Sequence, residues 1–291
     1  MLACITAILD DAGVLRGALP HARTGTHLLR HQATTALDAT VYRPLLCLVL
    51  QGAKEVGTPT KTLNVRAGQS LIVSHAVPVV SRITLATPDQ PYVALVYPLD
   101  LDLLRSLLPA VLPGSDPPAS DPFSICLCDS DDEMLGALLR YFHQCEREES
   151  RTLLAPITAR EIHARLLMGA YAGILRRLLW HESAASRIFR VTQEIGADPA
   201  RPIVVSDLAQ RAGMSASAFF EHFKAVTGTS PLQYQKDLRL LRARDRLRSS
   251  SAKVSQVAFS VGYESSAQFS REFSRKFGVS PRQDRELHHP A

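Results

Sequence analysis

The chain has 291 residues and a formal net charge of +5, and its basic excess lies in one part. Residues 183–291 carry 17 Lys and Arg residues against 10 Asp and Glu residues, whereas residues 1–182 carry 16 against 18. The length exceeds what one hydrophobic core usually serves and predicts two domains, while the basic tail favours a polyanionic partner. The five cysteines form no even disulfide framework and no zinc-ligand spacing, which argues against a disulfide-stapled secreted protein.

The first half opens with a segment that predicts no membrane anchor and continues with short strands. Residues 1–9 are mildly apolar but have no basic stretch and no apolar run long enough for a signal or a membrane span. We therefore expect a cytoplasmic protein without a membrane partner. Residues 45–50, 70–74 and 92–97 are apolar or β-branched runs bounded by glycines and prolines. Strands at this spacing, with turns between them, predict a sandwich or a small barrel.

A helical period replaces the strand pattern after Pro98. Residues 99–108 fit a helix, and residues 113–122 read as a proline-rich loop. Residues 131–147 open with acidic side chains, which favour a helix N-terminus. A last helix over residues 158–180 would share one apolar face among Ile162, Leu166, Ala170, Ile174 and Leu178. This face either covers the barrel or pairs with its copy in a second chain.

Few residues of the first half suggest catalysis or metal binding. Cys126 and Cys128 would lie on one face of a strand, where they could sense oxidants or a soft metal, although buried cysteines are the simpler interpretation. His75 is the histidine of this half that lies on a predicted strand, and we expect a satisfied core residue or pocket wall there. No His-x-His pair, Ser/His/Asp order, phosphate loop or paired carboxylates stand out. The expectation is a protein that is not an enzyme and has no cofactor or metal.

The last third contains one short pattern written twice. Residues 183–186 form the expected seam between the domains, and residues 187–195 form a helix closed by Gly196. Beyond it, the residues of the first copy are Leu208-Ala209, Ala212-Gly213, Phe219, Phe223, Gly228 and Ser230-Pro231. Those of the second copy are Val257-Ala258, Val261-Gly262, Phe269, Phe273, Gly278 and Ser280-Pro281.

Each copy predicts a helix, a tight turn with glycine, and a second helix anchored by two phenylalanines. The second helix of such a unit lies in the DNA major groove, with its early residues facing base edges. A helix over residues 231–248 would join the units and span about 27 Å. Adjacent major grooves on one DNA face are about 34 Å apart, so one chain could present two reading helices one DNA turn apart.

Residues 188–287 resemble the DNA-binding domain of the AraC/XylS family of transcription regulators, which has two helix-turn-helix units joined by a helix. The motifs that carry this resemblance are Gly213-Met214-Ser215, Phe219, Phe223-Lys224, Thr227-Gly228, Ser230-Pro231, Val257-Ala258, Val261-Gly262-Tyr263-Glu264-Ser265, Phe269-Ser270-Arg271 and Phe273. Residues 25–100, including the segments 44–52 and 68–70, are more distantly similar to the AraC-type N-terminal sensor and dimerisation domain.

The resemblance implies an α+β protein with a cupin-like β-barrel and trailing helices over residues 1–182. Residues 183–291 would form an all-α domain with two helix-turn-helix units. The implied function is sequence-specific DNA-binding regulation of transcription, controlled by a small-molecule effector bound in the N-terminal domain. The implied partners are double-stranded promoter DNA and that effector, with RNA polymerase and a second copy of the chain as further candidates.

In the first reading helix, the resemblance assigns the DNA-facing positions to Ala216, Ser217, Phe220 and Glu221, with Lys224 one turn later. Glu221 departs from the family, which commonly has a basic or amide residue there. A carboxylate repels phosphate, although it can accept a hydrogen bond from cytosine N4. Phe220 contacts a thymine methyl group or packs against its own domain. Glu221 also keeps open an interaction protein that no longer binds DNA.

In the second reading helix, the corresponding residues are Ser266, Ala267, Gln268 and Arg271. Gln268 suits bidentate readout of adenine, and Arg271 suits guanine or phosphate. The alternative for Arg271 is a surface salt bridge to Glu264 or Glu272. We expect this helix to carry more of the base recognition than the first.

Further basic side chains of the tail have two interpretations each. Lys224 and Lys276, near the ends of the reading helices, suit phosphate contacts or favourable charges at the helix C-termini. Arg239, Arg242 and Arg246 recur at three- and four-residue spacing on the joining helix. They either line phosphate or form a solvated stripe.

Overall fold

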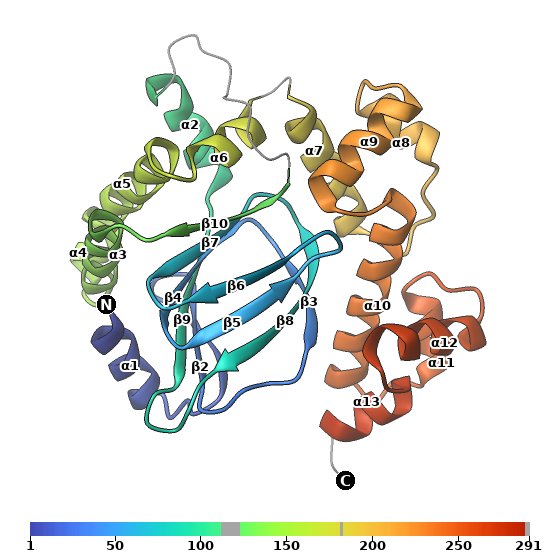
Figure 1. Ribbon diagram of the computed structural model, residues 1–291, viewed down its shortest axis with the longest axis horizontal. Coiled ribbons are helices and arrows are strands. Elements are labelled where there is room, and N and C mark those ends of the chain that lie inside the picture. Colours follow the sequence, from blue (N-terminus) through green and yellow to red (C-terminus); the bar gives the residue numbers. More distant parts are fainter. Residues whose placement is uncertain (112–122, 181–182, 289–291) are drawn as a thin grey trace.

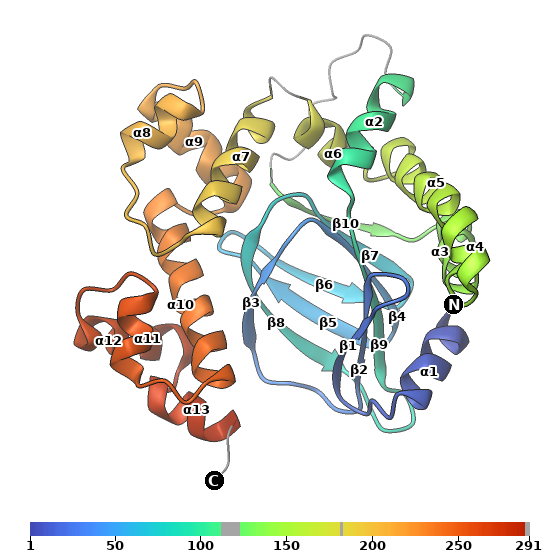
Figure 2. The same ribbon diagram turned by 180° about the vertical axis from the view of Figure 1, so that it is seen from behind.

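The computed structural model describes residues 1–111, 123–180 and 183–288, and it has the α+β architecture expected from the sequence. Two antiparallel β-sheets lie between a group of helices from the first half of the chain and the helices of the last third (Figures 1 and 2). None of the described helices is long and apolar enough to cross a membrane. The loop expected at residues 113–122 lies outside the described residues.

The larger sheet has six strands and the smaller sheet has four. The order in the larger sheet is β1 (Gly17–His21), β2 (Thr26–His31), β9 (Tyr92–Pro98), β4 (Leu45–Gln51), β7 (Gln69–Val73) and β10 (Ile125–Asp129). The order in the smaller sheet is β3 (Asp38–Tyr42), β8 (Val77–Leu85), β5 (Ala53–Gly57) and β6 (Thr62–Arg66). The strands expected at residues 45–50, 70–74 and 92–97 are confirmed as β4, β7 and β9. They read as continuous apolar runs because side chains are buried on both faces of this sheet.

Strand β4 shows how one sheet serves two hydrophobic cores. Successive side chains of a strand point to opposite faces. Cys47 and Val49 therefore enter the core between the sheets, while Leu46 and Leu48 enter the core on the other face. That second core is covered by helices α1 (Leu2–Asp11), α2 (Leu101–Val111), α3 (Asp132–Cys145), α5 (Ala155–Met168) and α6 (Ala172–Leu179).

The single helix expected at residues 158–180 is wrong, because the chain breaks there into α5 and α6. Gly169 ends α5 in an extended conformation, and its N–H donates to the Arg165 carbonyl at 2.8 Å. Glycine loses more conformational freedom in a helix than other residues, so it favours such a break. Most of the expected apolar face is nevertheless buried: Ile162, Leu166 and Ile174 belong to the core under the larger sheet and Leu178 is buried, whereas Ala170, at the break, is exposed. Of its two possible roles, covering the barrel is the one observed.

Three helices of the first half differ from expectation or were not expected. Helix α2 begins two residues later than the expected helix at residues 99–108, and the helix expected at residues 131–147 is confirmed as α3. Helix α1 was not expected from the sequence. Neither was the short helix α4 (Glu148–Leu153), whose composition is mostly polar.

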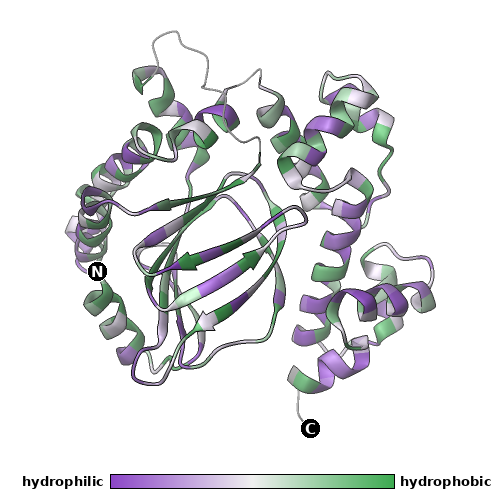
Figure 3. Cartoon of the chain, in the orientation of Figure 1, coloured by the Kyte–Doolittle hydropathy of each residue, from purple (hydrophilic) through white to green (hydrophobic). Residues whose placement is uncertain are grey.

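The last third is helical throughout its described part. It consists of α7 (Ala184–Ala197), α8 (Val205–Arg211), α9 (Ala216–Thr227), α10 (Pro231–Ser249), α11 (Val254–Ser260), α12 (Ser266–Phe277) and α13 (Pro281–His288). The helix expected at residues 187–195 is therefore confirmed, and α10 confirms the joining helix. One core forms around α7–α10 and another around α10–α12. Hydrophilic residues predominate on α10, α12 and α13 in Figure 3.

Hydrogen bonds to main-chain carbonyls join the sheets to the helical tail. Both the backbone N–H and the hydroxyl of Ser124 donate to the carbonyl of Val226 at the end of α9. From the opposite direction, the hydroxyl of Tyr234 on α10 donates to the carbonyl of Ala76 at 2.7 Å. A salt bridge of 2.6 Å between Arg244 on α10 and Asp38 on β3 adds to these contacts. The tail is thus held to the barrel at several points along α9 and α10.

His75 lies two residues after the end of β7 rather than on a strand, and it is a satisfied core histidine of this junction. Its side chain is buried, Nδ1 lies 2.8 Å from the Ser74 hydroxyl, and Nε2 lies 2.9 Å from the Ala185 carbonyl at the start of α7. Burial lowers the pKa of His75 from 6.5 to about 4. The group is therefore neutral in the folded protein at neutral pH.

The buried His75 predicts a loss of stability in acid. Its folded-state pKa lies below its unfolded value, so the unfolded chain takes up the proton first, and stability present above pH 6.5 falls toward pH 4. We expect the free energy of unfolding to drop by about 2 kcal/mol from this residue between neutral pH and about pH 5. Urea unfolding at both pH values, compared between the protein and His75→Gln, isolates the effect from that of other histidines. Equal pH slopes for the two proteins would contradict it.

Candidate nucleic-acid interface

The two copies of the sequence pattern fold into matching helix-turn-helix units, α8–α9 and α11–α12. Ser215 caps α9 by accepting a hydrogen bond from the Ala218 N–H, and Ser265 caps α12 by accepting one from the Gln268 N–H. Glycine at the C-terminus of each helix adopts a left-handed conformation, with φ of 78° at Gly228 and 74° at Gly278. Serine at the N-cap and glycine after the last turn are the residues that these helix ends favour.

The phenylalanines that anchor each second helix are fully buried. Phe219 and Phe223 lie in the core of the first unit with ring centroids 5.6 Å apart. Phe269 and Phe273 occupy the matching places in the second unit, with centroids 5.5 Å apart. Four-residue spacing places each pair on the inner face of its helix. The opposite faces of α9 and α12 are thereby directed away from the cores.

The outer face of α9 carries the residues expected to face DNA. Ser217, Phe220, Glu221 and Lys224 are all exposed, and each lies three or four residues from another member of the set. Phe220 is 46% exposed, so a large part of its ring is accessible on this face. The Lys224 side chain forms no hydrogen bond or ion pair with the described residues. The first unit therefore presents one cation, one carboxylate and one aromatic ring.

The outer face of α12 presents the Arg271 side chain to solvent, although the sequence also allowed it to be held in a salt bridge. Ala267, Gln268 and Arg271 are exposed, and Arg271 has no hydrogen bond or ion pair within the described part of the chain. The alternative salt bridge to Glu272 is not formed. That carboxylate instead accepts from Lys236 at 3.0 Å and from the Tyr263 hydroxyl at 2.9 Å.

The amide of Gln268 is already engaged in a hydrogen bond. Its Nε2 donates to Oε1 of Glu272 at 3.2 Å. Burial raises the pKa of Glu272, but the hydrogen bonds from Lys236, Gln268 and Tyr263 together lower it by more. The pKa is therefore below its usual value. The carboxylate stays ionised at neutral pH. Readout of adenine by Gln268 would require its amide to turn away from Glu272.

Lys276 and Arg275 occupy different sides of the last turn of α12. Nζ of Lys276 lies 2.6 Å from Oδ1 of Asp237 on α10, so this side chain braces the reading helix against the joining helix. The phosphate contact expected for Lys276 remains a prediction, and it would require Lys276 to leave this ion pair. Arg275 was not singled out from the sequence, although it lies four residues after Arg271 and is likewise exposed. That four-residue spacing was the feature of the sequence that could have placed Arg275 on the same helix face as Arg271.

Of the three arginines expected to form a stripe on α10, Arg239 serves the fold. Arg239 donates to three main-chain carbonyls: Nε to Pro199 at 2.7 Å, Nη1 to Gly262 at 2.9 Å and Nη2 to Ala200 at 3.0 Å. Pro199 and Ala200 precede α8, whereas Gly262 is the turn of the second unit. One guanidinium therefore ties both helix-turn-helix units to the helix between them.

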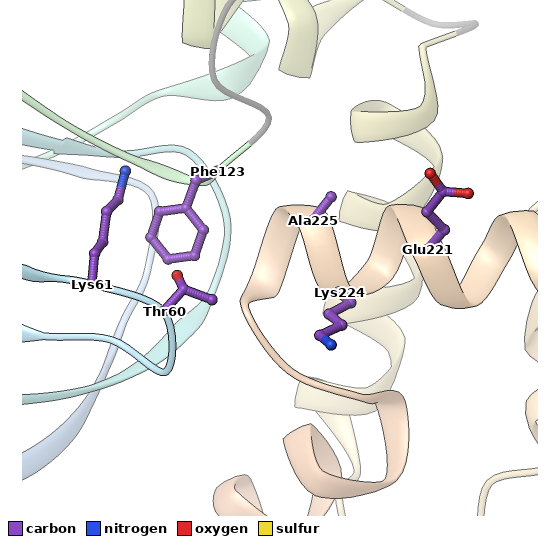
Figure 4. Close-up of a pocket in the computed structure, with 6 residues that line it drawn as sticks. All are labelled: Thr60, Lys61, Phe123, Glu221, Lys224 and Ala225. Atoms are coloured by element: carbon purple, nitrogen blue, oxygen red, sulfur yellow. The ribbon is translucent and has the colours of Figure 1, made fainter.

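The barrel borders the first reading helix. A cleft of about 480 Å³ separates the turn between β5 and β6, at Thr60 and Lys61, from Glu221, Lys224 and Ala225 of α9. Figure 4 shows Phe123 at the barrel side of this cleft, with Ala225 facing it and Glu221 directed away. The second unit lies on the side of α10 away from the sheets (Figures 1 and 2). The two reading helices thus have unequal surroundings.

Two capped helix-turn-helix units on one helix, joined to paired β-sheets, are the architecture of a DNA-binding transcription regulator. The family profile of the AraC-type transcriptional regulator N-terminus matches residues 23–174, more than half of the chain, and a helix-turn-helix domain profile matches residues 208–286. The chain belongs to the AraC family of transcriptional regulators. This is a family of regulators rather than enzymes, as expected from the sequence.

Individual relatives agree with the family. The HTH-type transcriptional activator RhaS of Escherichia coli O139:H28 is 31% identical over 144 residues, which are 49% of this chain and 51% of that protein. The regulator AlkR of Acinetobacter baylyi is 37% identical over 92 residues, or 32% and 30% of the two chains. The chain spans about half, or less, of the length of the curated relatives it matches.

A solved structure shares the whole architecture. Unsaturated fatty acid bound ToxT from Vibrio cholerae superposes with a TM-score of 0.57 at 11% identity, covering 89% of this chain and 95% of that one. At this identity the likeness concerns the fold. It extends over the sheets and both helix-turn-helix units, which supports the α+β arrangement described above.

Proposed function

We propose that residues 183–291 bind promoter DNA with sequence preference and that residues 1–182 control this binding, so that the protein regulates transcription. The observation that carries the proposal is the pair of matched reading helices, with Arg271 exposed and unpaired on the second. The 19 residues of α10 span about 28 Å, a length suited to adjacent major grooves. Base recognition falls mainly to α12, because α9 presents Glu221 toward the DNA.

The first test is salt-dependent binding to genomic fragments. Affinity that comes largely from phosphate contacts falls steeply as salt displaces the protein. We expect gel-shift titrations to show a preferred set of fragments and a strong decrease of affinity between low and physiological salt. Binding that lacks both sequence preference and salt dependence would favour an interaction protein instead.

The second test concerns Arg271 itself. We expect Arg271→Ala to weaken binding to the preferred fragment by about 1–3 kcal/mol and to relax preference at one base position. The control is Arg105→Ala, which removes a partly exposed arginine of α2, paired with Asp102, on the side of the sheets away from the reading helices. Binding isotherms at fixed salt measure both variants. Equal affinities for Arg271→Ala and the unchanged protein would remove Arg271 from the contacts.

A cleft between the two halves supports control by a small-molecule effector. Its volume is about 540 Å³, within the usual range for ligand pockets. Arg43 and β3 line it from the N-terminal half, and Gln193, Tyr234 and Asp245 line it from the tail. A ligand held by the N-terminal half at this place would touch both halves and so favour one arrangement of them. The fatty acid bound by ToxT supports the presence of an effector in this protein, but it does not indicate the chemical class of that effector.

A second copy of the chain and RNA polymerase are the remaining proposed partners. Most of the face of α5 and α6 that could have paired two chains is buried, which favours other residues for a dimer contact. The exposed apolar side chains of Leu153, Leu154 and Ile157 lie at the junction of α4 and α5, and that of Met168 lies at the other end of α5. These support self-association at the end of the molecule opposite the reading helices (Figure 1).

A further inference from the structure

Two cysteines of strand β10 lie side by side on the edge of the larger sheet. Cys126 and Cys128 point to the same face of the strand, and their Sγ atoms are 3.6 Å apart. Both thiols are free and only partly buried. They pack against the core beneath the helices, whereas Leu127 between them faces the core between the sheets. The alternating strand thus creates a pair of adjacent thiols in contact with solvent.

The backbone geometry disfavours a disulfide between these residues. A disulfide needs its sulfur atoms about 2.05 Å apart and its Cα atoms usually within about 6.8 Å. Two steps of extended strand already separate the Cα atoms by about 6.6–6.8 Å, at the limit of that range. Closing the bond would therefore bend β10 away from β7. The pair is arranged to stay as two thiols.

The separation of the sulfur atoms suits a single bridging atom. Two bonds of about 2.3 Å that meet at a tetrahedral angle place their sulfur atoms about 3.7 Å apart, whereas a linear arrangement needs about 4.6 Å. The observed 3.6 Å matches the bent case without movement of the strand. Thiolates select soft ions and metalloids over hard ones. Among the described residues, no group of three or more His, Cys, Asp or Glu side chains could hold a metal ion, so the bound atom must bring its remaining ligands with it.

The surroundings of the two cysteines favour the binding of a thiophilic ligand over oxidation of the thiols. Burial, with a smaller contribution from the neighbouring Cys126, raises the pKa of Cys128 to about 12. Thiols that stay protonated at neutral pH react slowly with peroxides, because the thiolate is the nucleophile. A strongly thiophilic ligand can still displace both protons as it binds.

We propose that Cys126 and Cys128 form a dithiol site for a trivalent arsenical, R–As(III), whose occupancy alters DNA binding by the tail. For an arsine oxide, two S–H bonds and the As–O bond break, two As–S bonds form, and the oxygen leaves with both protons as water. No electron is transferred, so no oxidant is needed. The organic group fills the third position of arsenic, which two thiols alone leave open.

The coupling to DNA follows from what precedes the dithiol in the chain, and it rests on the proposed function. Ser124, two residues before Cys126, donates twice to the Val226 carbonyl at the end of reading helix α9. The Ser124 carbonyl also accepts from the Ser74 N–H at 2.9 Å, which fixes this residue beside β7. A bridge across Cys126 and Cys128 restrains both side chains at the start of the same edge strand. Its effect therefore reaches the residue that holds α9.

The binding step is tested with phenylarsine oxide on the full-length chain. We expect one molecule per chain by intact mass, the loss of two titratable thiols, and reversal by excess dithiothreitol. Cys126→Ser and Cys128→Ser should each abolish dithiothreitol-reversible capture at equimolar reagent. Cys4→Ser, which alters a thiol outside β10, is the matched control and should bind as the unchanged protein does. Equal capture by all four proteins, or none by any, would overturn the site.

Two further arms define the ligand and the regulation. Cadmium chloride alone is the soft-metal probe; tighter binding of cadmium than of the arsenical would overturn the assignment to arsenic. Gel shifts with the preferred fragment should change in affinity by about fivefold or more on arsenical binding, and only when both cysteines are present. Capture without that change would overturn the regulatory role. Absence of DNA binding by the untreated protein would instead contradict the proposed function, while the mass and thiol measurements still decide the site.

Discussion

Gly262→Ala is expected to lower the free energy of unfolding by roughly 3–5 kcal/mol, because this turn combines a left-handed backbone with close contacts. Gly262 has φ of 91°, and an added Cβ would lie 2.5 Å from the Ala200 carbonyl oxygen and 3.0 Å from Cζ of Arg239. The nearest atoms belong to the backbone, so a side-chain rotation does not relieve the clash. The turn of the second unit would have to move away from α10.

The matched control is Gly278→Ala in the same unit. Gly278 has a similar φ of 74°, but an added Cβ would meet nothing within 4 Å. Its expected cost is therefore only the backbone strain of about 1–2 kcal/mol. Urea unfolding of the two variants separates strain from crowding. If both variants lost the same stability, the tight approach of Gly262 to Ala200 would be refuted.

Arg239→Met is expected to lower the free energy of unfolding by about 2–4 kcal/mol, the second-largest effect that we predict. Methionine keeps much of the aliphatic packing but removes all three donated hydrogen bonds. The Pro199 carbonyl keeps a bond from Gln235 at 3.0 Å, whereas those of Ala200 and Gly262 lose their donor. Because the same guanidinium bonds both helix-turn-helix units, DNA affinity should fall together with stability.

Arg242→Met provides the comparison on the same helix. Arg242 is half-buried and makes one long hydrogen bond of 3.4 Å, to the Ala197 carbonyl. We expect this variant to change stability by less than about 0.5 kcal/mol. Thermal unfolding and gel shifts on both variants distinguish a clamp, in which Arg239 holds both helix-turn-helix units to α10, from a general need for positive charge. Equal losses of DNA affinity would point to phosphate contact by the whole arginine stripe and contradict the clamp.

The repeat was predictable because each unit needs the same few residue types at the same places. Buried phenylalanines, a turn glycine and a capping serine are visible in the sequence, and they give two superimposable patterns. The outward positions of Phe220 and Arg271 came from the resemblance to the AraC/XylS family, and the structure places both side chains on exposed helix faces. Strands β4, β7 and β9 were equally visible, since runs buried on both faces are apolar throughout.

The contacts that depend on distant main-chain atoms were not predictable. The sequence does not show that the carbonyls of Pro199, Ala200 and Gly262 converge on Arg239. The spacing of the α10 arginines was therefore equally compatible with contact to phosphate or to solvent. Lys276 gave the same ambiguity, because its partner Asp237 lies on another helix. The break after α5 was missed because the apolar face continues in sequence across Gly169. In each case local spacing was compatible with two structures, and tertiary packing selected one.

The junction between barrel and tail has a consequence for exchanging parts between related proteins. The tail offers two main-chain carbonyls, at Val226 and Ala185, to Ser124 and His75 of the barrel, and returns one hydroxyl, that of Tyr234. Carbonyls are present whatever side chain stands at their position. A tail from another family member therefore needs the same helix ends, one tyrosine and an arginine at the place of Arg244 to dock here, so we expect chimeric regulators to accept a new tail while retaining these sheets.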